Sequence, residues 1–343
     1  MTVYNGQAYL SQAIESLLNQ SFSNFELIIV NDHSTDGSCE IIKKYCLQDD
    51  RIITLNNTSN FGPFKSANQG FRIAKGTYIA RMDSDDLSHP HRFERQLDFL
   101  KSHPDIGLLG SNGYYIDEKG KKLKPFKRHE NDLNIRWGLL FNSQFLHSTI
   151  IFKRSLLDHV GGYREAPLYS QDYDMYIRLL DHTTGANLKD RLVYWRRTNE
   201  NISSKFKQDQ LRFGIKIAID NINRLFGYQF VVDPNEFLFY RSFYRGSFTN
   251  ANADQVAKYM QIIDEFSSAH PISPSEKSKL LREIGSRFFE SIYRKGINKE
   301  NFSHLSLIAS LSPLAVPIGI KNLFFRAVDK VFGPKTQNTQ KMH

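Results

Sequence analysis

The stretch FELIIVNDHSTDG at residues 25–37 decides the fold class of this 343-residue chain. Its apolar first half has the length of a strand that is buried on both faces, and polar side chains begin abruptly at Asn31. A second apolar run at residues 51–55 ends in polar residues in the same way. Residues 9–18 and 37–47 carry apolar side chains at helical spacing. This order of helix, strand, helix and strand predicts an α/β domain with a mostly parallel sheet.

The alternation of helix and strand continues along the chain. A helix at about residues 63–75 leads to the strand TYIARM at residues 77–82, which runs into the acidic turn DSDD at residues 83–86. Ligands of parallel sheets bind at the carboxyl ends of the strands. Because Asp32 and Asp85 both follow such ends, we expect them to belong to one binding site.

The second part of the chain has a different pattern. From about residue 205 the strand signals stop, and amphipathic helices are predicted at residues 210–226, 254–267 and 275–294. We therefore expect an α/β domain over residues 1–204 and an α-helical C-terminal region over residues 205–343. The length suits one large domain followed by a smaller one.

Composition excludes several classes of protein. A hydrophobic fraction of 40% with 24% charged residues is ordinary for a globular protein. The two cysteines, Cys39 and Cys46, show no spacing typical of a disulfide framework or a zinc site, which favours a reducing compartment. Residues 205–343 contain 20 Lys and Arg against 12 Asp and Glu, but no nucleic-acid-binding motif accompanies this charge. We expect no nucleic acid partner.

A membrane surface is the other partner that the basic C-terminal region suggests. No run of 18 apolar residues and no signal peptide occurs, so we expect a cytoplasmic protein without a spanning helix. Residues 305–320 are apolar but contain two prolines, and residues 321–332 mix aromatic side chains with cations. These residues either lie on the inner face of the cell membrane or pack as core helices; both alternatives remain open.

The acidic turn carries the clearest chemical signal. Asp83, Asp85 and Asp86 lie within four positions, and such a cluster is electrostatically costly unless a cation neutralises it. Mg²⁺ or Mn²⁺ prefers oxygen ligands of this kind and often shares its shell with substrate phosphates. The alternative is a solvated turn in which Asp86 or Ser88 caps the next helix.

Three segments together resemble the family 2 glycosyltransferases: VYNG at residues 3–6, ELIIVNDHSTDG at residues 26–37 and ARMDSDD at residues 80–86. The resemblance covers about the first 204 residues. It implies a Rossmann-like GT-A domain that binds a nucleotide-diphosphate sugar, a divalent metal, and inverting transfer of the sugar to an acceptor hydroxyl. The Q-x-x-R-W motif of processive synthases is missing, which favours transfer of a single sugar.

The resemblance also implies roles for residues on the donor side. Thr2, Tyr4 and Asp32 are similar to the nucleoside pocket of the family, with Asp32 accepting a hydrogen bond from the base. Asn60 and Lys65 resemble the segment after the third strand, although Lys65 can equally be a solvated helix lysine.

Further donor-side roles fall on the acidic turn and on a later segment. Asp83 is similar to the carboxylate that faces the ribose, and Asp85 to the one that holds the metal. The segment YWRRTNENIS at residues 194–203 resembles one that folds over the diphosphate, so that Arg196 or Arg197 would pair with phosphate oxygens.

The acceptor side rests on GGYR at residues 161–164 and SQDYD at residues 170–174. They resemble the family segment that contains the general base, which identifies Asp172 as the residue that removes the proton of the acceptor hydroxyl. The alternative is a structural carboxylate at a helix N-terminus. His147 matches a histidine near the acceptor cleft of the family, or else is a buried core histidine.

One feature departs from the family pattern. A buried strand of five or six apolar residues usually precedes the VYNG segment, and the loss of three or four aliphatic side chains would cost about 5 to 12 kcal/mol. We therefore expect an upstream extension of the reading frame, or a damaged copy.

Two rival functions remain at this point. A nucleotidyltransferase would need a glycine-rich basic loop after the first strand, and residues 3–12 contain none. A non-catalytic sugar-nucleotide-binding or scaffold protein is consistent with the short start, but not with the retained Asp85 and Asp172. The resemblance favours UDP as the carrier, a hexosyl or N-acetylhexosaminyl group, and a glycan or lipid-linked glycan acceptor in the synthesis of cell-surface polysaccharide or glycolipid.

Overall fold

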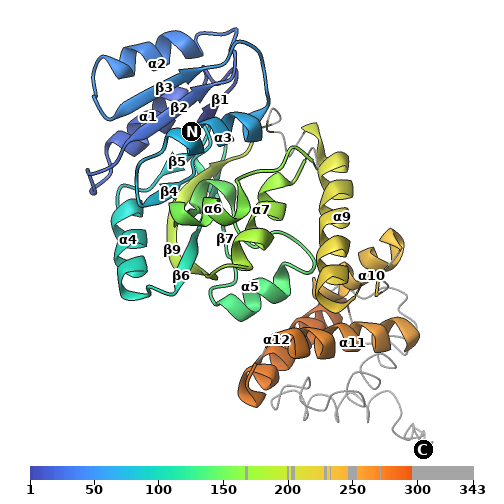
Figure 1. Ribbon diagram of the computed structural model, residues 1–343. Coiled ribbons are helices and arrows are strands. Elements are labelled where there is room, and N and C mark those ends of the chain that lie inside the picture. The colour runs from blue at the N-terminus through green and yellow to red at the C-terminus, as the bar shows by residue number, and fades with distance from the viewer. Residues whose placement is uncertain are drawn as a thin grey trace, which may run out of the picture. The chain divides into compact units, whose positions relative to one another are not determined.

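The computed structural model describes residues 1–166, 169–198, 201, 205–227, 230–231, 233–245, 253–270 and 272–295 (Figure 1). The chain divides into two compact units, Met1–Asn221 and Ile222–His343. The first unit contains all the strands of the described residues, and each unit is presented separately below.

A parallel sheet of three strands opens the first unit. Its order is β1 (Thr2–Val3), β2 (Leu27–Asn31) and β3 (Ile52–Asn56). The connecting helices are α1 (Leu10–Leu18), α2 (Ser38–Cys46) and α3 (Pro63–Ile73). The parallel strands and the helices between them confirm the sequence prediction for this part of the chain.

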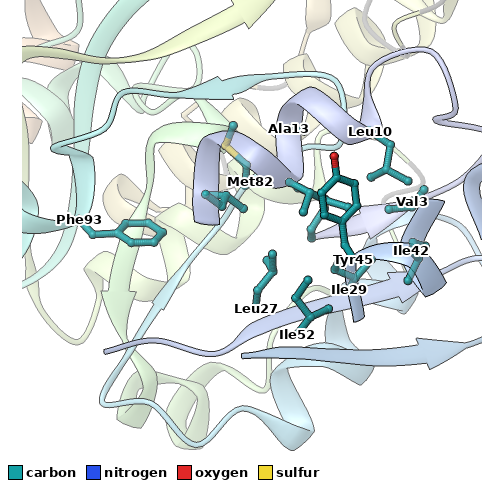
Figure 2. Close-up of a cluster of buried hydrophobic side chains, with 13 residues drawn as sticks. Val3, Leu10, Ala13, Leu27, Ile29, Ile42, Tyr45, Ile52, Met82 and Phe93 are labelled. Atoms are coloured by element: carbon teal, nitrogen blue, oxygen red, sulfur yellow. The ribbon is translucent and has the colours of Figure 1, made fainter. Parts of the chain in front are cut away.

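Both faces of β2 are covered, which explains its uninterrupted apolar sequence. Leu27 and Ile29 belong to a buried cluster with side chains of α1 and α2 (Figure 2). On the other face, Gly70 of α3 lies so close to Ile28 and Val30 that a Cβ atom there would be 3.5 and 3.4 Å from their methyl groups. Only the carboxyl end of β2 carries polar side chains, at Asn31 and Asp32, and both are buried.

A second sheet follows in the order β4-β8-β6-β9-β5, with β7 paired to β6. Its strands are β4 (Tyr78–Ala80), β5 (Leu87–Ser88), β6 (Ile106–Ile116), β7 (Lys122–Phe126), β8 (Ile151–Lys153) and β9 (Thr184–Arg196). Only the pair β6 and β9 is parallel among the described strands of this sheet. A parallel bridge between Thr2 and Asp83 links the two sheets. The sequence did not predict the antiparallel pairs.

Short helical segments complete the first unit. They are α4 (Arg92–Ser102), α5 (Asp132–Gly138), the 3₁₀ turns η1 (His147–Thr149) and η2 (Arg154–Leu156), α6 (Leu157–Val160) and α7 (Gln171–Leu180). Two of them, η1 and α7, carry residues of the site described below.

The regular secondary structure of the described residues after position 205 is entirely helical, as the sequence predicts. Helix α9 (Lys207–Phe226) spans the division between the units and is followed by α10 (Pro234–Tyr244), α11 (Ala253–Ala269) and α12 (Pro274–Lys295). Within the described part of the chain, no helix combines the length and apolarity needed to cross a bilayer. Residues 305–332, for which membrane contact and core packing both remained open, lie outside the described residues.

Candidate active site

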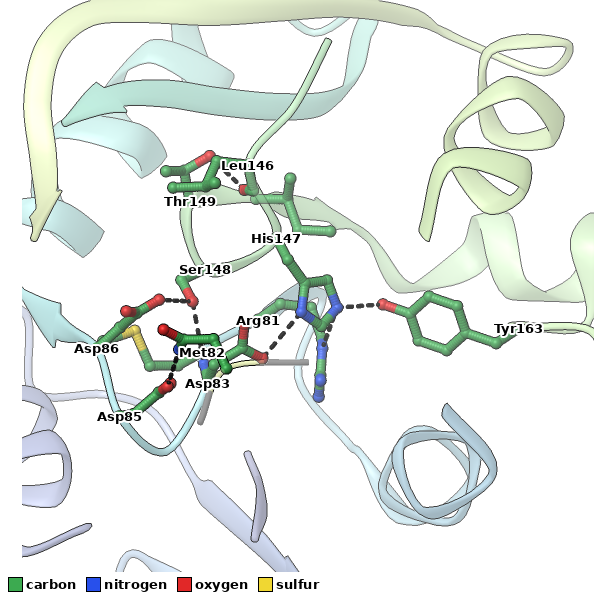
Figure 3. Close-up of polar contacts among 12 residues, drawn as sticks. Arg81, Met82, Asp83, Asp85, Asp86, Leu146, His147, Ser148, Thr149 and Tyr163 are labelled. Carbon is green, nitrogen blue, oxygen red and sulfur yellow. Dashed lines mark hydrogen bonds and ion pairs between the residues drawn. The ribbon is translucent and has the colours of Figure 1, made fainter. Parts of the chain in front are cut away.

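The acidic turn after β4 is fixed by the 3₁₀ turn η1 (Figure 3). The Ser148 hydroxyl accepts the N–H of Asp83 at 3.1 Å and donates to the carboxylate of Asp86. The other oxygen of Asp86 accepts the backbone N–H of Arg196 at 2.8 Å. Asp86 is fully buried, and burial, followed by the charges of Asp85 and Asp83, raises its pKa well above the usual value. Asp86 therefore anchors the turn from inside the protein.

Asp83 faces the opposite side and contacts a histidine. Its carboxylate lies 2.9 Å from Nδ1 of His147, while Nε2 of His147 lies 2.8 Å from the Tyr163 hydroxyl and 3.3 Å from Nε of Arg81. When Nδ1 carries the proton it donates to Asp83, and the single lone pair of Nε2 then faces both the Tyr163 hydroxyl and Nε of Arg81. Burial opposes ionisation of Asp83, but the neighbouring His147 and Arg81 outweigh it and lower its pKa.

Asp85 is the carboxylate that suits a metal. One oxygen accepts a hydrogen bond from Asn201 at 2.7 Å. Burial and then the charge of Asp83 raise the pKa of Asp85 to about 6, so a cation would stabilise its ionised form. No group of three or more metal-binding side chains occurs among the described residues. The arrangement fits a Mg²⁺ or Mn²⁺ ion that takes only part of its shell from the protein and the rest from a diphosphate.

The two arginines at the end of β9 have different environments. Arg196 is fully buried, and its guanidinium donates to the carbonyls of Asp85 (2.8 Å), Asp117 (3.2 Å) and Glu118 (2.9 Å) and to Oε1 of Gln12 (2.9 Å). Arg197 is exposed and lies over the ring of Tyr115. The geometry therefore favours Arg197 over Arg196 as a partner for phosphate oxygens.

Asp32 lies at the carboxyl end of β2, as predicted, and organises the loop after β3. Its Oδ1 accepts Nδ2 of Asn57 at 2.7 Å and the N–H of Phe61 at 2.9 Å, and its Oδ2 accepts the N–H of Gly62 at 2.8 Å. A carboxylate has about four acceptor positions, so these three bonds leave one of them, on a side chain that is only 1% exposed. The backbone N–H of Asp32 donates to the carbonyl of Val3, which places Asp32 itself beside β1.

The remaining donor-side residues surround this loop and β1. Asn60 accepts the N–H of Gly62 at 3.0 Å through its side chain. Lys65 is half exposed, forms a 4.0 Å ion pair with Glu165 and lies over the ring of Phe61. Thr2 pairs with Asp83 through the backbone bridge.

Tyr4 is 52% exposed at the end of β1. An aromatic ring that is open to solvent beside an ordered loop provides a surface on which a base can pack.

Asp172 lies in the first turn of α7. Burial raises its pKa, the interaction with His147 opposes this, and the charge of Asp83 adds to the increase. Asp172 is therefore in the same electrostatic environment as the acidic turn. Asp174 differs, because it forms ion pairs with Arg178 at 2.8 Å and Arg164 at 3.2 Å and so has a structural role.

The comparisons with known proteins identify the family and the fold of this chain. The sequence model described as Glycosyl transferase family 2 matches residues 1–161. An uncharacterized glycosyltransferase of Methanocaldococcus jannaschii is 35% identical over 216 residues, which are 62% of this chain and 74% of the relative. The chain belongs to glycosyltransferase family 2. The O-antigen biosynthesis glycosyltransferase WbnJ of Escherichia coli, another relative of this family 2 enzyme, is 33% identical over 58% of this chain and 79% of its own.

Solved structures share the fold of this glycosyltransferase. Staphylococcus aureus TarS, residues 1–349 in complex with UDP-GlcNAc, has a TM-score of 0.56 and 19% identity, covering 87% of this chain and 91% of its own. The mannosyltransferase PcManGT of Pyrobaculum calidifontis, in complex with GDP-Man and Mn²⁺, has a TM-score of 0.51 and 15% identity. The match covers 95% of this chain and 86% of the mannosyltransferase chain. These likenesses confirm the GT-A fold predicted from the sequence.

Four site residues of this glycosyltransferase were not predicted: Arg81, Ser148, Tyr163 and Asn201. Each of them forms one or two hydrogen bonds with a predicted residue that is distant in the sequence, for example Asn201 with Asp85. Ser148 follows His147 directly in the sequence, so its proximity to a candidate residue was the only available signal.

Proposed function

We propose that the protein is an inverting glycosyltransferase that moves a single sugar from a nucleotide-diphosphate sugar to an acceptor hydroxyl. The observation that carries the proposal is that the acidic turn and Asp172 share one electrostatic environment. The acidic turn is linked through His147 to Tyr163, and the charge of Asp83 acts on Asp172. A donor-binding turn and a candidate base in one site are what such a displacement requires.

The donor half of the proposal assigns the nucleoside to Thr2, Tyr4 and Asp32, with Asn60 and Lys65 beside it. Asp32 would accept a hydrogen bond from the base through its remaining lone pair. Its three existing hydrogen bonds support this role, because they hold the carboxylate in one orientation.

The diphosphate would lie between Asp85 and Arg197. A bound Mn²⁺ or Mg²⁺ supplies positive charge that stabilises the diphosphate leaving group. Asp83 would face the ribose, while Ser148 and Asp86 keep the turn in place. UDP is the proposed carrier, with a hexosyl or N-acetylhexosaminyl group.

In the acceptor half, Asp172 would remove the proton of the attacking hydroxyl. Burial raises the pKa of this carboxylate and makes it a stronger base, and the neighbouring His147 limits the increase. Attack from the side opposite the leaving nucleotide gives inversion at the anomeric carbon. We assign His147 to the acceptor side, where its contact with Tyr163 would position the lining of the cleft.

The acceptor is proposed to be a glycan or lipid-linked glycan of cell-surface polysaccharide or glycolipid synthesis. The name of the O-antigen biosynthesis relative supports this class. We propose that the enzyme works in the cytoplasm at the inner face of the cell membrane, with catalysis in residues 1–204 and a helical C-terminal region over residues 205–343.

A panel of nucleotide sugars tests this function. The purified protein is incubated with each donor and Mn²⁺, and release of the nucleoside diphosphate is measured with and without candidate acceptors. We expect one donor to be consumed by wild type and by Asp158→Asn, which alters an exposed carboxylate, but not by Asp172→Asn. Binding of a donor without turnover by wild type, in the presence of every acceptor class, would instead indicate a non-catalytic sugar-nucleotide-binding protein.

A further inference from the structure

An exposed basic segment adjoins the candidate active site. Residues 119–128, which we term the basic hairpin, comprise part of the turn after β6, the strand β7 and the two residues that follow it. The segment contains six cations and no acid: Lys119, Lys121, Lys122, Lys124, Lys127 and Arg128. All five lysines are exposed, and β7 pairs only with β6 among the described strands. The hairpin thus presents a row of positive charge at an open sheet edge.

Acidic side chains of the described residues do not pair with the lysines of the basic hairpin. None of the five forms an ion pair with another residue in the described part of the chain. Two of them lie over aromatic rings instead: Lys122 at 5.1 Å from Tyr114, and Lys124 at 5.9 Å from Tyr115. A charged partner from outside the chain would therefore displace no ion pair of the described residues.

An apolar side chain stands among these charges. Leu123 is 53% exposed, and lysines occupy the positions on either side of it. Lysine and proline on an edge strand can simply prevent pairing with another sheet, and this accounts for the charge and for Pro125. It does not account for a solvent-exposed leucine between them.

The basic hairpin is tied directly to the acidic turn. The guanidinium of Arg196 donates both to the carbonyls of Asp117 and Glu118, just before the hairpin, and to the carbonyl of Asp85. A surface bound at the hairpin would therefore lie close to the position proposed for the donor diphosphate.

We propose that the basic hairpin docks the catalytic unit on an anionic lipid membrane. Lysine is a hydrated point charge that suits a diffuse field of lipid phosphates, whereas arginine forks suit one shaped phosphate site, and five of the six cations are lysines. Leu123 enters the boundary between head groups and acyl chains while the flanking lysines remain at the head groups. This docking rests on the proposed function in one respect: it would bring the active site to a lipid-linked acceptor.

Co-sedimentation of the full chain with vesicles tests this docking. One set of vesicles contains equal amounts of phosphatidylglycerol and phosphatidylcholine, and the other contains phosphatidylcholine alone. The variant Lys121→Gln/Lys122→Gln/Lys124→Gln is compared with Lys43→Gln/Lys44→Gln/Lys75→Gln, which removes three exposed lysines elsewhere in the same unit. Each lysine near an anionic surface contributes substantially to binding, so we expect the hairpin variant to lose about tenfold or more in partition coefficient, and the control to stay near wild type.

Two further measurements separate the alternatives. Leu123→Ser should weaken binding to the anionic vesicles at high salt as well as at low salt, because its contribution is apolar. Residues 305–332 are identical in all variants, so their own membrane contact would not produce a difference between hairpin and control. Equal binding by the two triple variants overturns the proposal. So does a hairpin variant that keeps vesicle binding but loses binding to soluble polyphosphate, because this would indicate an anionic polymer as the partner.

Nucleotide-sugar hydrolysis by the same variants keeps the two proposals distinct. The hairpin variant should hydrolyse a soluble donor at the wild-type rate. Loss of vesicle binding with normal hydrolysis would support docking independently of the identity of the sugar, and absence of hydrolysis in wild type would contradict the proposed function alone.

Discussion

Replacing Arg196 should destabilise the protein rather than weaken donor binding directly. Its buried guanidinium makes four hydrogen bonds to segments that are far apart in the sequence. A hydrogen bond to a charged group contributes about 1.5–3 kcal/mol, but bonds made by one side chain do not add fully, and single substitutions rarely exceed about 4–5 kcal/mol. We expect Arg196→Ala to lower the free energy of unfolding of the first unit by about 3–5 kcal/mol.

Tryptophan fluorescence during urea unfolding measures this change. Both tryptophans of the chain, Trp137 and Trp195, belong to the first unit, so the signal does not depend on the second. Arg197→Ala is the matched control, because Arg197 is exposed and should cost less than about 1 kcal/mol. It should instead raise the KM for the donor. A stable Arg196→Ala with weakened donor binding, beside an Arg197→Ala with unchanged KM, would refute the assignment.

Three other substitutions test the site. Asp85→Asn should abolish metal-dependent donor binding and transfer together, and full wild-type activity in EDTA would contradict this. Asp172→Asn should lower kcat by roughly 10² to 10⁴ with nearly unchanged donor affinity. The raised pKa of Asp172 means that a higher pH is needed to ionise it. On acidification, the kcat of the wild type should therefore fall at a higher pH than an ordinary aspartate would give. An unaltered pH profile in Asp172→Asn would exclude Asp172 as the base. Ser148→Ala should cost about 1–3 kcal/mol in the same fluorescence measurement, since Asp86 loses a donor; no loss would mean that Ser148 does not hold the turn.

The sequence predicted those parts of the fold that local patterns determine. The apolar run of β2 is continuous because both of its faces are covered, and its polar end marks the place where Asp32 lies. The helices α1, α2 and α3 follow from their spacing of apolar residues. The family resemblance then predicted donor-side roles for Asp83 and Asp85 and an acceptor-side role for Asp172, and these roles stay predictions.

Long-range pairing escaped prediction for a physical reason. The parallel pair β6 and β9 joins segments about 80 residues apart, and nothing in either strand identifies its partner. The same holds for Ser148, whose hydroxyl matters only because the fold brings it to Asp86. Arg196 and Arg197 are adjacent in the sequence and alike in chemistry, yet Arg196, the last residue of β9, is buried and Arg197, which follows the strand, is exposed.

The three hydrogen bonds of Asp32 have a consequence for engineering the donor preference. The carboxylate that would contact the base also holds Asn57, Phe61 and Gly62 in place. Substitutions in that loop would therefore alter the orientation of Asp32, and a change at Asp32 would release the loop. Libraries that randomise residue 32 alone, or residues 57–62 alone, should yield mostly inactive variants. Transplanting residue 32 together with residues 57–62 from a relative should instead preserve the hydrogen bonds between them.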